Sequence, residues 1–282
     1  KATGTQTHAT LWIFMKTLVK TEWQKLAVAS VAIMSAITSV SVMADDKLPA
    51  PVQALQAQGL KVIDSFSAPG GLTGYAASAN GRPLILYVTA DGEHAIIGTM
   101  VDKDGENLSA EPVEKLIMGP QNKKAWSLLE SESAWVADGS DKAKHIVYMF
   151  DDPECPYCHR FWQATRSWVD SGQVQIRHVL VGVISAKSPD ESAAILAAKD
   201  PAKALADHMN STNSGKPTPL DISTVTDKAR QQVSKNEDLM SALNVGGTPS
   251  IYYPKADDSI GFVGGMPQPG QLAEVMGSPD FN

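Results

Sequence analysis

The stretch from Asp151 to Trp162, DDPECPYCHRFW, holds both cysteines of this 282-residue chain. Cys155 and Cys158 are separated by two residues, and His159 follows directly. Three kinds of site use such spacing: a redox-active pair of thiols, half of a structural metal site, and a Cys-x-x-Cys-His attachment point for haem. The sequence on either side of the pair favours one of these interpretations.

The pair lies between a predicted buried strand and a predicted helix. Residues 145–150, HIVYMF, form a short apolar and partly β-branched run that is typical of a buried strand. The pattern from Cys155 to about Asp170 is helical, and Gly172 ends it. Six side chains fall on one face of this helix and are expected in the core: Cys158, Phe161, Trp162, Thr165, Trp168 and Val169.

This context argues against haem and zinc. A haem pocket would have to wrap the start of the same helix around a large planar ligand. A structural zinc site needs four ligands, whereas the chain has no second cysteine pair, and its remaining candidates, His145, His178 and His208, are isolated from one another. We therefore expect no metal and no cofactor, and the redox interpretation is favoured.

The start of a helix suits a reactive thiol because free backbone N–H groups and the positive end of the helix dipole stabilise a thiolate. Pro156 fits the first turn, which leaves the N–H groups of Tyr157 and Cys158 free to face the Cys155 sulfur. Cys158, one turn further on the apolar face, is expected to be shielded and to resolve a mixed disulfide formed at Cys155. His159 would lower thiol pKa values when protonated; an exposed helix histidine without that role is the alternative.

Three acidic residues precede or flank the first cysteine. Asp151, Asp152 and Glu154 would oppose thiolate formation if they faced the sulfur. We interpret them as ordinary charge complements of a helix N-terminus.

The N-terminal region has the pattern of a cleavable secretory signal. Met15 is a plausible start, with residues 1–14 possible non-native sequence; lysines then precede the apolar run from Leu26 to Ile37, and cleavage is expected after Ala44. An uncleaved membrane anchor is the alternative, since residues 26–44 approach the length that spans a bilayer.

Export and charge together limit the function. Without residues 1–44 the chain keeps 20 basic and 30 acidic residues, a net charge of −10, which argues against a nucleic-acid partner. An exported protein normally uses cysteines as structural staples. Two cysteines so close in sequence close almost no loop, so a reactive role explains this pair better.

Three further parts follow the leader. Residues 45–108 predict a small meander: a helix over residues 49–58, strands over 60–66, 72–79, 83–90 and 95–101, and hairpin turns at Asn80-Gly81 and Asp91-Gly92. Residues 109–138 predict a helical linker, with helices over 111–118 and 125–136 interrupted at Gly119-Pro120.

The remaining residues, 139–282, predict a mixed sheet covered by helices. Its strands are expected over 145–150, 174–181, 245–253 and 260–263, with a helical insertion over about 186–244, broken at Ser211–Pro219, and a final helix over 271–276.

The strand, the CPYCHRFW helix and the later Gly247-Thr248-Pro249 ahead of a strand resemble a thioredoxin fold. With the export signal, the N-terminal meander, the linker and the insertion sequence AAILAAKDPAK at 193–203, the mature chain resembles the periplasmic DsbC/DsbG thiol-disulfide isomerases, and their DsbG branch in particular. The resemblance implies that Pro249 is a cis-proline and that the Thr248 backbone pairs with an extended substrate segment. The second, structural cysteine pair of DsbC-like members is absent.

The resemblance also implies a cystatin-like N-terminal domain that joins a homodimer, a cleft that holds misfolded or oxidised periplasmic proteins, and a DsbD-type membrane reductase that keeps the cysteines reduced. The expected location is the periplasm of a Gram-negative bacterium. The main hypothesis is an isomerase or reductase in which Cys155 attacks non-native disulfides. Reduction of sulfenic acids on single cysteines and a redox-independent chaperone activity are the alternatives.

Overall fold

The computed structural model describes residues 47–211 and 219–278. The predicted leader, signal peptide and alternative anchor lie outside these ranges, as does most of the predicted break at 211–219. Within the two described ranges, no helix is both long and apolar enough to cross a bilayer.

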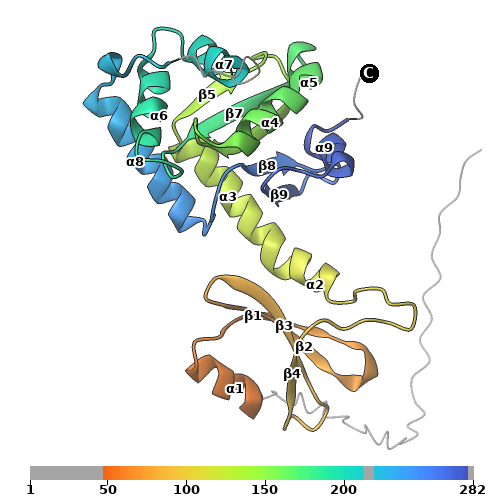
Figure 1. Ribbon diagram of the computed structural model, residues 1–282. Helices are drawn as coiled ribbons and strands as arrows, with labels where there is room; N and C mark the ends of the chain where they lie inside the picture. Colours follow the sequence, from red (N-terminus) through yellow and green to blue (C-terminus); the bar gives the residue numbers. More distant parts are fainter. Residues whose placement is uncertain (1–46, 212–218, 279–282) are drawn as a thin grey trace, which may run out of the picture. The chain divides into compact units, whose positions relative to one another are not determined.

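The first part is an antiparallel sheet with one helix, as predicted (Figure 1). The helix is α1 (Ala50–Ala57), and the strands, in spatial as well as chain order, are β1 (Lys61–Ser67), β2 (Thr73–Ala79), β3 (Arg82–Val88) and β4 (Ala95–Ile97). Asn80 and Gly81 both have positive φ, as a tight hairpin turn requires. The last strand ends earlier than predicted, and Val101 makes only an isolated bridge with Asn107.

Both faces of this sheet are covered by apolar residues. Val52 of α1 packs with Leu60 and with Tyr75, Leu86 and Val88 of the sheet. On the other face, one cluster contains residues of the sheet and of the following helical segment: Ala68, Ala76, Ile85, Tyr87 and Ile117. The alternation of side chains along β2 and β3 explains the two cores.

The linker differs from its prediction in one respect. Gly119-Pro120 does not interrupt it: α2 (Ala110–Val113) runs through the π-helical turn η2 (Glu114–Met118) into α3 (Gly119–Glu132). Gly119 N–H donates to the Glu114 carbonyl in the wide turn. A wide turn leaves more room between the proline ring and the carbonyl groups of the preceding turn. Pro120 also lies in the first turn of α3, where its missing N–H is tolerated.

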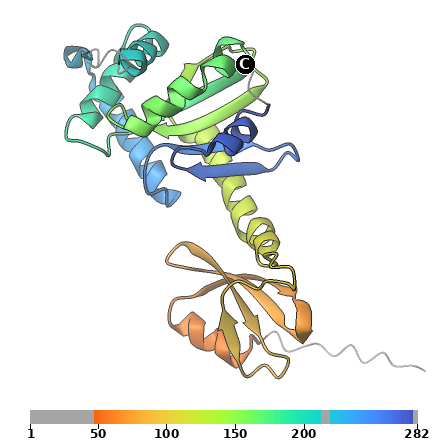
Figure 2. The same ribbon diagram turned by 45° about the vertical axis from the view of Figure 1, so that its right-hand side comes forward.

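The second sheet has five strands in the order β5-β7-β6-β8-β9. Helices lie beside this sheet in both views (Figures 1 and 2). They are β5 (Trp135–Asp138), β6 (His145–Asp151), β7 (Val174–Leu180), β8 (Ser250–Pro254) and β9 (Ile260–Gly264). Only β6 and β7 pair in parallel. The prediction that residues up to 136 are helical was wrong, because residues 135–138 pair with the edge of β7 as a strand.

The cysteine helix covers one face of this sheet. It consists of α4 (Pro156–Ala164) and α5 (Arg166–Asp170), which are separated at Thr165. The Thr165 hydroxyl donates to the Phe161 and Trp162 carbonyls, and such back-bonding bends helices. All six side chains predicted for its inner face are buried. The final helix α9 (Pro269–Val275) contributes to the same cluster through Leu272 and Val275.

The opposite face packs on α3 and on the last helix of the insertion, α8 (Asp227–Ala242), through Leu129, Phe150 and Met240 among others. The insertion also contains α6 (Ser188–Ala197), α7 (Pro201–Ser211) and the short η4 (Ile222–Thr224). Helix α7 packs against β5 and α4 through Leu205 and Met209, which cluster with Trp162. The insertion therefore covers one side of α4.

Candidate active site

Cys155 is the N-cap of α4, at the carboxyl end of β6. A turn formed by residues 152–155 carries the chain from the strand to the helix, with Cys155 N–H donating to the Asp152 carbonyl. The Cys155 thiol donates to the Thr248 carbonyl oxygen at 3.3 Å. The two cysteines are free thiols in this structure.

Several donors stabilise the Cys155 thiolate and lower the pKa of Cys155 to about 6. The hydrogen bond from the Cys158 thiol is the largest contribution, and burial opposes it. The Thr248 side chain and the backbone N–H groups of Cys158 and Tyr157 lower the pKa further. Cys155 is therefore mostly a thiolate at neutral pH, as a nucleophile in disulfide exchange must be.

Cys158 has the opposite environment. Its side chain is fully buried within the cluster of Phe161, Trp168 and Met149. Burial, which is the largest cause, together with the neighbouring Cys155 and Asp151, raises the pKa of Cys158 well above its usual value. The pair thus combines one ionised and one protonated thiol.

Thr248 and Pro249 lie beside the pair, and the peptide bond between them is cis, as the thioredoxin resemblance implies. Pro249 is followed directly by β8, so the Thr248 carbonyl is fixed next to Cys155. Tyr157 is half exposed on the first turn of α4, and the Arg160 guanidinium lies over its ring.

Of the two interpretations of His159, the exposed helix histidine is wrong, because the side chain is buried. Its Nε2 lies 2.7 Å from the Pro153 carbonyl oxygen, which is also 2.9 Å from Nε2 of His208 on α7. It is buried because α7, from the insertion, packs against α4. The two histidines hold the turn before Cys155 through one carbonyl group.

A row of charged groups on the α4 side of the sheet, two of them fully buried and two half-buried, was not predicted. Asp138, His178 and Asp151 lie on the adjacent strands β5, β7 and β6. His178 Nδ1 is 2.7 Å from Asp151 Oδ2, and His178 Nε2 is 3.5 Å from Asp138 Oδ2. Arg166 of α5 pairs with both oxygens of Asp138. We call these four residues the charge row.

The charge row balances two cations against two anions. Burial lowers the pKa of His178, but the carboxylates of Asp138 and Asp151 raise it more, to about 9. His178 is therefore a cation at neutral pH. Burial also acts against ionisation of Asp138, but His178 and Arg166 hold the pKa of Asp138 well below its usual value. The interpretation of Asp151 as a helix-end charge complement was therefore wrong: it is the buried last residue of β6.

Asp152 and Glu154 have structural partners instead. The buried Asp152 carboxylate accepts the N–H groups of Glu154, Val183 and Ile184, which ties the turn before Cys155 to the loop after β7. Glu154 pairs with Lys187 at 2.7 Å. Neither carboxylate needs to face the Cys155 sulfur.

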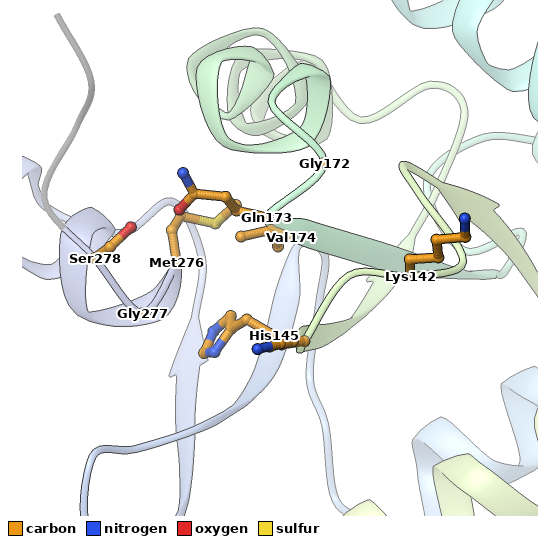
Figure 3. A pocket seen from close by; sticks show the side chains of 9 residues that line it. Lys142, His145, Gly172, Gln173, Val174, Met276, Gly277 and Ser278 are labelled. Atoms are coloured by element: carbon orange, nitrogen blue, oxygen red, sulfur yellow. The ribbon is translucent and has the colours of Figure 1, made fainter.

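A separate hollow of about 480 Å³ lies at the other end of β6 and β7 (Figure 3). Its lining includes Lys142, His145, Gln173 and Met276, and His145 Nε2 bonds to the Val275 carbonyl at 2.8 Å. Its lining contains neither cysteine. Among the described residues, no group of three or more histidine, cysteine or carboxylate side chains is arranged to hold a metal ion.

Comparison with known proteins gives matches to both parts of the chain. A disulfide bond isomerase protein N-terminal domain matches residues 42–110, and a thioredoxin-like domain matches residues 136–278. The thiol:disulfide interchange protein DsbG of Pseudomonas aeruginosa is 43% identical over 83% of this chain and 90% of its own length. DsbG of Escherichia coli is 44% identical over 83% and 93%. Among solved structures, the catalytic domain of Proteus mirabilis ScsC is 22% identical, with a TM-score of 0.47, over 56% of this chain and 96% of that domain.

Proposed function

The chain belongs to the DsbC/DsbG family of thiol:disulfide interchange proteins, and we propose that it works in the periplasm as a disulfide isomerase and reductase through Cys155. The observation that carries the proposal is the contrast between the two thiols. The pKa of Cys155 is lowered to about 6, whereas that of the buried Cys158 is raised. One sulfur is thus ready to attack while the other keeps its proton.

In the first step, the Cys155 thiolate attacks one sulfur of a non-native disulfide. A bond forms between Cys155 and that sulfur, and the other substrate sulfur leaves as a thiolate. Isomerisation is complete when a different substrate thiol attacks the substrate sulfur bound to Cys155, forms a new substrate disulfide and expels Cys155 as a thiolate. Reduction is complete when Cys158 attacks Cys155 instead, which releases reduced substrate and leaves a Cys155–Cys158 disulfide.

The groups around Cys155 support binding of an extended substrate segment. The Thr248 carbonyl already accepts a hydrogen bond from Cys155 and is available for a substrate N–H once the thiol ionises. Tyr157 is 51% exposed, and Val183 and Ile184, tied to the turn before Cys155, are 49% and 50% exposed. Apolar side chains next to a substrate cysteine would cover these three residues. Such side chains are exposed in misfolded proteins.

The chain is also proposed to act as a homodimer through its N-terminal domain. Strand β4 is at the edge of its sheet, and Ile96 and Ile97 on it are 58% and 55% exposed. An exposed edge with apolar side chains favours pairing with a second copy. A membrane reductase of the DsbD type would return the Cys155–Cys158 disulfide to the dithiol form.

The proposal is tested by recovery of ribonuclease activity from its scrambled, fully oxidised form in a glutathione buffer with catalytic amounts of the chain. We expect recovery with the wild type and none above the buffer background with Cys155→Ala. Cys158→Ala should retain isomerisation, because expulsion of Cys155 by a substrate thiol does not need it. Equal recovery with Cys155→Ala would contradict the proposal.

The same variants separate the alternatives. If the wild type gave no recovery but restored a sulfenylated protein in a manner dependent on Cys155, the substrate would be a single oxidised cysteine. If a variant lacking both cysteines suppressed aggregation as well as the wild type, the chaperone activity would be independent of the thiols.

A further inference from the structure

The turn over residues 152–155 joins β6 to the cysteine helix, and the Cys155 N–H closes it by donating to the Asp152 carbonyl at 2.9 Å. Such a turn has one central peptide unit, here between Pro153 and Glu154, whose direction distinguishes type I from type II. Type II needs a positive φ at Glu154, and among the described residues Glu154 is not one with positive φ. The hydrogen-bonded turn is therefore of type I.

The central peptide unit of this turn is held on both sides. In a trans peptide the C=O and the N–H point in opposite directions. The Pro153 carbonyl oxygen lies 2.7 Å from Nε2 of His159 and 2.9 Å from Nε2 of His208. Both nitrogens donate, because a carbonyl oxygen only accepts. On the other side, the Glu154 N–H donates to Asp152 Oδ1 at 2.9 Å.

The two histidine contacts are buried, and this makes them stronger than the other contact at the turn. The side chains of His159 and His208 are 6% and 2% exposed. A buried carbonyl that loses its donors is not compensated by water. The ion pair of Glu154 with Lys187 is different, because the Lys187 side chain is 60% exposed and such pairs contribute little. The direction of the central peptide therefore depends mainly on its buried donors.

The two donors come from different parts of the chain. His159 belongs to α4, the helix that the turn precedes, whereas His208 belongs to α7 of the insertion, which packs against α4. Pro153 does not itself choose the direction of the central peptide, since proline suits its position in both type I and type II turns. The insertion thus contributes directly to the backbone geometry before Cys155.

We propose that His208, together with His159, is a positioning residue for the nucleophile Cys155. Through the Pro153 carbonyl, the insertion keeps the turn in the form that places the Cys155 sulfur at the start of α4. This inference rests on the proposed function, in which Cys155 attacks the substrate. It assigns to the insertion a part in the reaction, although α7 contributes no group that touches the sulfur.

The link from the turn to the sulfur is short. Cys155 is both the last residue of the turn and the N-cap of α4, so a rotation of the preceding peptide unit displaces its side chain. In the present position, the backbone N–H groups of Tyr157 and Cys158 stabilise the thiolate of Cys155. A sulfur displaced from these donors ionises less readily and attacks more slowly at low pH.

The experiment measures ionisation of Cys155 in the reduced full chain. The ultraviolet absorbance of the thiolate is followed from pH 4 to pH 9, and the rate of alkylation by iodoacetamide is measured at pH 6. The melting temperature of each sample is recorded as well. His208→Leu removes the N–H donor, and His208→Gln keeps one. Ser192→Ala is the matched control, because it removes another fully buried donor of the insertion, which bonds to the Val181 carbonyl at 2.8 Å.

We expect His208→Leu to raise the midpoint of Cys155 ionisation by about half a pH unit and to slow alkylation at pH 6 about twofold. Replacement of both His159 and His208 by Leu should raise the midpoint by about one unit and slow alkylation about fivefold, because the carbonyl then has neither donor. His208→Gln should restore the midpoint of the wild type. Ser192→Ala should lower the melting temperature and leave the midpoint unchanged.

Two results would overturn the proposal. A lower melting temperature of His208→Leu with an unchanged midpoint would give His208 a structural role only. Equal shifts in His208→Leu and His208→Gln would exclude the N–H donor as the cause. If the double variant does not fold, the comparison of the two single His208 variants decides.

Failure of the proposed function gives a different result. If Cys155→Ala still isomerises scrambled ribonuclease, Cys155 is not the nucleophile, whatever the His208 variants do to its ionisation. Isomerisation that requires Cys155, with the same midpoint in His208→Leu as in the wild type, leaves the proposed function intact and removes only the positioning role of His208.

Discussion

The two sheets of the molecule are stabilised differently. The N-terminal sheet buries Tyr75, Leu86 and Val88 on one face, and the main polar contact within its buried part joins Tyr87 Oη to Ser109 Oγ at 2.5 Å. The five-stranded sheet buries ion pairs directly beneath its cysteine helix, with His178 and Asp151 fully buried. Loss of charge from one partner leaves the other uncompensated in a buried ion pair, so the stability of this sheet is expected to depend on pH.

The edges of the two sheets differ too. Strand β4 carries exposed isoleucines at an open edge, whereas β5, an edge of the second sheet, is short and packs against α7. A small domain with a modest core gains most from pairing with a second copy. The comparison teaches that association is to be sought in the first sheet and pH-dependent stability in the second.

The largest expected effect is on association. Ile97→Asp in both copies should remove about 2 kcal/mol of apolar burial from each side of the proposed dimer and raise its dissociation constant by about 10³-fold. Analytical ultracentrifugation over a range of concentrations measures it. Ile222→Asp is the matched control, since Ile222 is 58% exposed on the insertion and should leave the dimer intact. Equal dimerisation of both variants would exclude the β4 edge as the interface.

The second prediction concerns the apolar core. Leu86→Ala removes a fully buried side chain from the N-terminal sheet and should lower the free energy of unfolding by about 3 kcal/mol. Because that core contains no ion pair, the loss should be the same at pH 6.5 and pH 8.5. Denaturant unfolding at the two pH values measures it, and a loss that changed with pH would contradict the assignment of an uncharged core.

The charge row predicts the opposite pH behaviour for the second sheet. The pKa of His178 is raised to about 9, so its contribution to stability is complete below the ordinary pKa of about 6.5 and is lost as the pH rises through 9. The free energy of unfolding should fall by about 2 kcal/mol between pH 6.5 and pH 8.5. His178→Gln should be less stable at pH 6.5 and should show a flatter dependence. Parallel pH profiles of the two proteins would mean that His178 is neutral in the folded state.

Local patterns predicted much of the catalytic part. Six apolar positions at helical spacing identified the inner face of α4 and α5, and the Thr248-Pro249 pair was found beside Cys155, as the resemblance implied. Elements whose conformation depends on distant partners were missed. Residues 135–138 form a strand because β7 pairs with them, and His159 is buried because α7 lies over it.

The charge row has no local signature, since its four members come from separate elements between residues 138 and 178. A signal was nevertheless present in the alternation of each strand. Asp151 follows Val147 and Met149 at a period of two, and His178 lies between Ile176 and Leu180 in the same way. A polar residue that continues an inward-facing apolar series must be buried with a partner, and only the order of the strands reveals which partner it has.

The smallest predicted effect tests the link between the two thiols. The hydrogen bond from Cys158 is the largest contribution that lowers the pKa of Cys155 to about 6. Cys158→Ala should therefore raise the Cys155 pKa to about 7, a change of roughly 1.4 kcal/mol, which the ultraviolet absorbance of the thiolate measures. Cys158→Ser is the matched control, because its hydroxyl can still donate and should keep the midpoint near that of the wild type. If both variants shifted equally, the hydrogen bond would not be the cause, and the backbone N–H groups at the start of α4 would account for the low pKa.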